Sequence, residues 1–153
     1  MQRTIGFAAL LILALAPVGR APSDHAAVLQ VVKRVFDGMR TRDTALMRAQ
    51  FEPSARLLSI DKKSGAPRVQ VSDPGGWIAA VARGTGPAWD ERIFDPVVEL
   101  DDNIAHVWAY YEFWRGDQLS HCGYDSFFLV KLGDEWKVSQ VADSRRTDCK
   151  PRR

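Results

Sequence analysis

Three side chains in the C-terminal third of the sequence, His121, Asp125 and Asp143, are of types suited to acid–base chemistry. His121 titrates near neutral pH. Asp125 is expected on the same strand face, about 7 Å away, where it would orient the imidazole. Asp143 follows two apolar residues, so burial would raise its pKa and make it a base. All three also have a structural interpretation, in which the histidine packs and the acids cap a turn or pair with arginines.

The first 21 residues have the layout of a secretory signal peptide. Arg3 and the amino terminus provide a positive start, and residues 5–16 form an apolar run of twelve residues. Such a run is short for ~30 Å of hydrocarbon. We expect a signal peptide over residues 1–21 with a poorly defined cleavage point, and a secreted or periplasmic location. No stable membrane insertion is expected after its removal, and an uncleaved anchor is the alternative.

Cys122 and Cys149 are the only cysteines in the sequence. In an oxidising compartment an even pair usually forms a disulfide. If residues 133–135 form a three-residue hairpin turn, Cys122 lies opposite Arg146. A tail that turns back after Arg146 then brings Cys149 within reach of Cys122. The sequence therefore predicts a Cys122–Cys149 disulfide.

Charge and absent motifs exclude several function classes. The formal net charge of +2 falls to zero without the first 21 residues, which hold two arginines and no acid, so no general attraction to nucleic acid is expected. The sequence contains no phosphate-binding glycine loop, H-E-x-x-H or G-x-S-x-G motif. No metal-ligand spacing surrounds the cysteines. His121 and Cys122 point to opposite strand faces, which disfavours a nucleophilic thiol. We expect no metal, no cofactor and no nucleic-acid partner.

The order of predicted elements indicates an α+β fold. A helical apolar stripe covers residues 24–43, a second short helix covers 44–51 and stops at Pro53, and a third begins at Pro74. Strands are predicted at 55–61, 67–71, 90–102, 103–116, 118–132 and 135–146. We expect a cone-shaped domain of about three N-terminal helices packed on a curved, mostly antiparallel sheet, over residues 22–153.

Four segments carry a resemblance to a known family. They are W-x-x-Y-x-F at Trp108, Tyr111 and Phe113; SHCG-x-D-x-F at 120–127; W-K-V at 136–138; and A-D-S-R-R followed by Cys149. Together they resemble the nuclear transport factor 2-like superfamily, and more narrowly its small exported branch labelled putative lumazine-binding or polyketide cyclase-like. The resemblance implies the cone fold. Its enzymes use a tyrosine, aspartate or histidine inside the cone, but no defined catalytic motif matches here.

Aromatic residues are numerous enough to line a cone that stacks on a flat ligand. The candidate pocket residues are Trp77, Trp108, Tyr111, Phe113 and Tyr124. The alternative is that most of them belong to the core or to a subunit interface. Both faces of the strands at 104–114 and 119–132 carry bulky apolar residues, so both faces are expected to be covered. The superfamily commonly pairs through this sheet, which predicts a homodimer.

Three functions remain open at this point. The first is an exported cone-fold protein that binds a small, aromatic or apolar ligand of unknown identity without demonstrated catalysis. The second is an isomerase, dehydratase or cyclase, with His121, Asp125 or Asp143 as base and Tyr111 or Tyr124 as donor. The third is a non-catalytic interaction domain that uses the sheet face.

Overall fold

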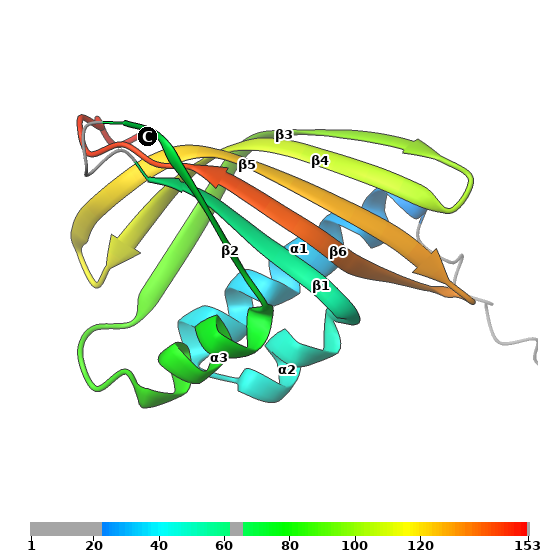
Figure 1. Cartoon of the computed structure of the whole chain (residues 1–153), viewed down its shortest axis with the longest axis horizontal. Coiled ribbons are helices and arrows are strands. Elements are labelled where there is room, and N and C mark those ends of the chain that lie inside the picture. Colours follow the sequence, from blue (N-terminus) through cyan, green and yellow to red (C-terminus); the bar gives the residue numbers. More distant parts are fainter. Residues whose placement is uncertain (1–22, 62–65, 153) are drawn as a thin grey trace, which may run out of the picture.

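The computed structural model describes residues 23–61 and 66–152 (Figure 1). The predicted signal peptide lies outside the described residues. None of the helices in the described ranges is long and apolar enough to cross a membrane.

Three helices pack on one face of the sheet, and each begins at a side-chain cap. In α1 (Asp24–Thr41), the Ser23 hydroxyl accepts a hydrogen bond from the Ala26 amide, and a stripe of valines, Phe36 and Met39 is buried. In α2 (Thr44–Ala49), the Asp43 carboxylate accepts from the Leu46 amide. In α3 (Pro74–Arg83), Asp73 is the cap and Pro74 occupies the first turn.

Six strands form one curved sheet that arches over the helices (Figure 1). Their order across the sheet is β2-β1-β6-β5-β4-β3. Strands β1 and β6 run parallel, and the other ladders between these described strands are antiparallel. The bounds are β1 (Phe51–Asp61), β2 (Arg68–Ser72), β3 (Trp89–Asp101), β4 (Ile104–Arg115), β5 (Gln118–Leu132) and β6 (Glu135–Ser144). The α+β prediction is confirmed.

The predicted order of two helices, two short strands, a third helix and four long strands is that of the structure. The description as three N-terminal helices fits only in part, because α3 lies between β2 and β3. One predicted boundary is wrong. Residue 51 begins β1 instead of ending α2, and Pro53 therefore sits inside a strand. The register of β1 against β6 shifts between Phe51 and Arg56, so Pro53 lies in an irregular stretch of the ladder. Proline has no N–H to donate, and it is tolerated here because the regular pairing with β6 is interrupted.

The β5–β6 hairpin has a shorter turn than predicted. Leu132 pairs with Glu135, so the turn holds two residues, with Gly133 at a φ of 62°. A bulge between Phe128 and Leu129 then inserts one extra residue on β6 and shifts the register by one. The two differences cancel, and Cys122 lies opposite Arg146 as predicted.

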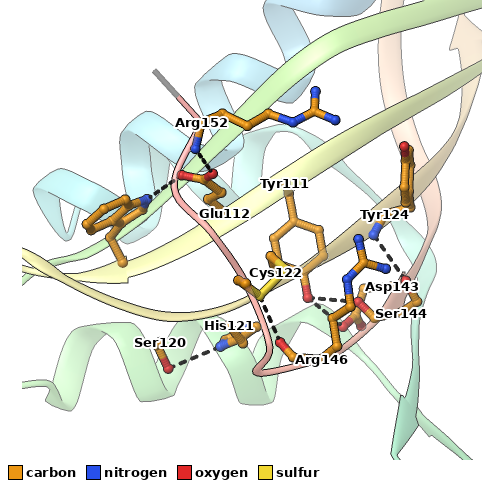
Figure 2. Close-up of a disulfide and its surroundings, with 12 residues drawn as sticks. Tyr111, Glu112, Ser120, His121, Cys122, Tyr124, Asp143, Ser144, Arg146 and Arg152 are labelled. Atoms are coloured by element: carbon orange, nitrogen blue, oxygen red, sulfur yellow. Dashed lines mark hydrogen bonds between the residues drawn. A yellow bond between two sulfur atoms is a disulfide. The ribbon is translucent and has the colours of Figure 1, made fainter.

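The C-terminal tail is fixed to the outer face of the sheet, which is the face away from the helices. Cys122 and Cys149 form a disulfide with their Cα atoms 6.0 Å apart, as predicted. The Cys122 and Arg146 backbones exchange two hydrogen bonds of 3.0 Å. Further along, the Arg152 amide donates to the buried Glu112 carboxylate (Figure 2). The Arg152 guanidinium lies 4.1 Å from the Tyr110 ring centroid. The tail therefore covers part of this face.

Loss of the disulfide should destabilise the protein only under oxidising conditions. We expect Cys149→Ser to lower the free energy of unfolding by about 2–4 kcal/mol, because the unfolded chain regains the freedom of a long loop. Thermal melts with and without reductant measure the effect. Reduced wild type should melt like the variant, and Cys122→Ser is the matched second variant. Equal melting temperatures for oxidised and reduced wild type would contradict this role.

Candidate functional site

A cavity of about 310 Å³ lies between the inner face of the sheet and helices α1 and α3. One part of its wall is aromatic, with Phe36, Trp77, Phe113 and Phe127. The other part carries polar and charged side chains: Glu91, Tyr111, His121, Asp125, Asp143 and Arg145. Residues of β1 and β2 complete the lining. An apolar wall with a small set of converging polar groups is the usual composition of a small-molecule site.

Six of the eight predicted site residues line this cavity: Trp77, Tyr111, Phe113, His121, Asp125 and Asp143. Trp108 and Tyr124 do not. They stack on each other on the outer face, with ring centroids 5.1 Å apart, and Trp108 is 45% exposed. Successive strand residues alternate between faces, so Trp108 cannot share a face with Tyr111, nor Tyr124 with Asp125. The predicted pocket set mixed the two faces, and these two residues are removed from it.

Glu91 lines the cavity but was not predicted from the sequence. It lies in β3 opposite Phe113, and it is partly buried. The sequence does contain one indication that Glu91 faces inwards. Residues two apart share a strand face, and the residues two positions before and after it, Trp89 and Ile93, are both apolar. A register shift between Phe94 and Val97, next to Asp95 at a φ of 48°, breaks the alternation along the rest of β3 and obscures that signal.

Glu91 on β3 and Asp125 on β5 both line the cavity, and their carboxyl groups interact there. Asp125 is 1% exposed, and its Oδ2 has no hydrogen-bond donor among the residues that the structure describes. Burial first, and then the Glu91 charge, raise the pKa of Asp125 well above its ordinary value. Burial also raises the pKa of Glu91, to about 7, although a hydrogen bond from Asp125 opposes that rise. Above pH 7 the pair therefore retains one proton, on Asp125, which donates to the Glu91 carboxylate.

Asp143 lies opposite Asp125 in the β5–β6 register, so a third carboxyl adjoins the pair. Its Oδ2 lies 3.5 Å from the Tyr111 hydroxyl and 4.0 Å from Nε of Arg145. Tyr111 is 1% exposed and donates a hydrogen bond of 2.9 Å to the Ser144 carbonyl (Figure 2). Burial, followed by the Asp143 charge, raises the pKa of Tyr111, so the phenol stays neutral and its proton is already engaged.

His121 is a neutral, packed side chain in this site. Burial, followed by the charges of Arg145 and Arg115, lowers its pKa to about 4. Its ring stacks on Phe113 with centroids 4.6 Å apart, and Nδ1 lies 3.2 Å from the Ser120 hydroxyl. Within the described chain no hydrogen bond joins it to Asp125. Four residues along a strand span about 13 Å, not the expected 7 Å, so Asp125 does not orient the imidazole.

A family model described as putative lumazine-binding matches residues 23–141. This match spans most of the sequence, including the cavity residues from Phe36 to Val141. The chain belongs to the putative lumazine-binding family. No curated protein matches it.

Solved structures show the same fold at low sequence identity. A nuclear transport factor 2-like protein from Cytophaga hutchinsonii has a TM-score of 0.67 and 13% identity, covering 82% of this chain and 100% of its own. The Kfla4162 protein from Kribbella flavida has a TM-score of 0.64 and 20% identity, covering 80% and 90%. A putative dehydratase of the same fold family from Streptomyces avermitilis has a TM-score of 0.63 and 13% identity, covering 80% and 96%. The predicted membership of the nuclear transport factor 2-like superfamily is confirmed.

In this member of the putative lumazine-binding family, Glu91 should make the pH dependence of stability unusual for a carboxylate. Its pKa is raised from 4.5 to about 7 on folding, so the folded state binds more protons in that window. The stabilisation is complete below pH 4.5 and is lost as the pH rises through 7. In Glu91→Gln this loss is absent. The free energy of unfolding of the variant, relative to wild type, should therefore rise by about 1–3 kcal/mol from pH 4.5 to 7.

Urea denaturation at several pH values measures this difference. Glu99→Gln is the matched control, because Glu99 is an exposed acid in the same strand. His121 changes stability in the opposite sense below pH 6.5, since its lowered pKa penalises the folded state as the pH falls towards 4. That contribution is common to wild type and variant and cancels in the difference. Identical pH profiles for wild type and Glu91→Gln would refute a raised Glu91 pKa.

Proposed function

We propose that the chain binds a small, flat, largely apolar molecule with a polar edge in the cavity between the sheet, α1 and α3. The observation that carries the proposal is the composition of the lining, which combines four aromatic side chains with a cluster of polar and charged ones. The volume of about 310 Å³ lies at the lower end of the range for small-molecule pockets. Trp77 packs edge-on against Phe51, with centroids 6.3 Å apart, which holds one aromatic wall in place.

A proton-transfer enzyme is the second candidate, and the pKa of Glu91 near 7 favours it. Such chemistry next to a carbonyl also needs a free hydrogen-bond donor to stabilise the developing oxyanion. Tyr111 donates to Ser144, and the Asp125 proton is directed at Glu91. The two obvious donors are therefore engaged inside the protein. This observation favours binding over catalysis as the primary function.

The proposal includes export from the cytoplasm. The Cys122–Cys149 disulfide is of a kind that persists in oxidising compartments. The signal-like segment at residues 1–21 supports the same location.

The aromatic wall gives a direct test of the binding proposal. Lumazine is a suitable probe, since the family description names it. We expect Trp77→Ala to weaken lumazine binding by about tenfold, because the ring loses a stacking surface. Trp108→Ala is the matched control, as it removes the same side chain from the outer face. Isothermal titration calorimetry measures both. Failure of the wild type to bind flat heterocycles, or equal losses in the two variants, would refute the proposed pocket.

We also propose that the chain forms a homodimer through the outer face of the sheet. Val97, Ile104, Trp108 and Phe128 lie on this face and are 39–54% exposed. An apolar patch of this kind on an otherwise soluble domain is typical of an interface.

Charge placed within this patch should dissociate the dimer. We expect Phe128→Glu to convert the protein to a monomer in sedimentation velocity experiments, because the interface would then bury an unpaired charge. The control is Val69→Glu, since Val69 is 62% exposed on the edge strand β2. A monomeric wild type, or a dimer unaffected by Phe128→Glu, would exclude this interface.

A further inference from the structure

The Glu91–Asp125 carboxyl pair presents acceptor oxygens at the polar end of the cavity. The Tyr111 hydroxyl is used on the Ser144 carbonyl at 2.9 Å, and burial and the Glu91 charge keep a proton on Asp125. Arg145 lies 4.0 Å from Asp143, beyond hydrogen-bond distance, so its guanidinium N–H groups are donors elsewhere on the lining. The carboxylate oxygens of Glu91 and Asp143 remain as acceptors on the lining. A ligand group that complements the carboxyl pair must supply hydrogen-bond donors.

Asp125 provides independent evidence for such a ligand. Its carboxyl lines the cavity, is almost fully buried, and has an Oδ2 without a donor in the described part of the chain. A buried polar atom without a partner costs about 1–3 kcal/mol. Two carboxyls in contact are tolerated only with a proton or another positive group between them. Without a ligand a proton serves this purpose, and a cationic donor group can replace it.

The charges around the pair suit a cation. Asp143 on β6 adds negative charge, and Tyr111 on β4 is neutral. Asp90 on β3 is already paired with Arg92, at 2.7 Å. His121 on β5 is also neutral above about pH 4, so it does not repel a positive ligand. Arg145 is the opposing charge, and it is half exposed and paired with Asp143. The aromatic wall adds ring faces, which attract cations as well as flat apolar surfaces.

We propose that the ligand of this cavity is a weakly basic, flat heterocycle whose amidine-type N–H edge binds the Glu91–Asp125 carboxyl pair. This inference rests on the proposed binding function and specifies its ligand class. Two parallel N–H groups match two carboxylate oxygens, as in bidentate guanidinium–carboxylate pairs. The neutral heterocycle enters, and the proton held between Asp125 and Glu91 moves to its ring nitrogen. The bound state is then a ring cation facing two carboxylates, with no covalent bond formed and no net proton gained or lost.

A matched pair of probes tests this ligand class. 2,4-Diaminopteridine has the amidine edge, and lumazine is its dioxo counterpart with the same ring system. We expect wild type to bind the diamino compound at least about tenfold more tightly, because charge-assisted hydrogen bonds form to the pair. The absorption spectrum of the bound diamino compound should be that of its cation, at a pH where the free ring is neutral. Calorimetry and absorbance titration give the two readouts.

Variants separate the inference from the proposed function. Glu91→Gln and Asp125→Asn should each abolish the preference for the diamino compound and the cation spectrum, while lumazine affinity changes less than about threefold. Trp77→Ala should weaken both probes alike. Equal affinities for the two probes in wild type, or a preference that survives both carboxyl variants, would overturn the ligand class and leave the pocket standing. Binding of neither probe would overturn both proposals.

Discussion

The close approach of three strands at Gly123 is the constraint on which the site depends. A Cβ atom at this position would lie 1.8 Å from the Ser144 carbonyl oxygen and 2.8 Å from the Tyr111 ring. Glycine is needed here for space, since any side chain would displace backbone. Because Gly123 has no side chain, Tyr111 can lie across β5 and donate to Ser144 at the end of β6. The hydrogen bond from Tyr111 to Ser144 also brings Asp143 next to Tyr111. The C-terminal tail continues from Ser144 to the backbone pairing with Cys122.

Burial of acids at the polar end lowers the stability of the fold, and the neighbouring groups limit that cost. Asp125 avoids a buried charge by retaining its proton, and Glu91 accepts the resulting hydrogen bond. His121 stays uncharged because burial, followed by the charges of Arg145 and Arg115, lowers its pKa. Neutral groups therefore fill much of the site at physiological pH, although six of its side chains are titratable. Apolar residues would give a purely structural core the same packing at a smaller loss of stability, and this supports the proposed ligand binding.

Much of the fold was predictable because it depends on local patterns. The stripe in α1, the caps at Ser23, Asp43 and Asp73, and the alternation in β4 and β5 are all visible in the sequence. The irregularities of the sheet could not be predicted from such local patterns. The extra residue in β6 and the bulge that accommodates Pro53 depend on pairing between distant strands. Glu91 was missed because the register shift in β3 obscures the alternation around it, and because its partner carboxyls come from the distant strands β5 and β6.

The segment SHCGYDSF serves both faces of the sheet at once. His121, Gly123 and Asp125 point towards the cavity, while Cys122 and Tyr124 point to the outer face. The residue that tethers the tail is thus flanked by two that shape the pocket. Ser144 completes the connection, because its carbonyl accepts from Tyr111 and its hydroxyl accepts from the Tyr124 amide (Figure 2). A disulfide on the outer face therefore restrains the same strand end that positions Tyr111 and Asp143. Cavity geometry and tail attachment are properties of one short stretch of sheet and cannot vary independently.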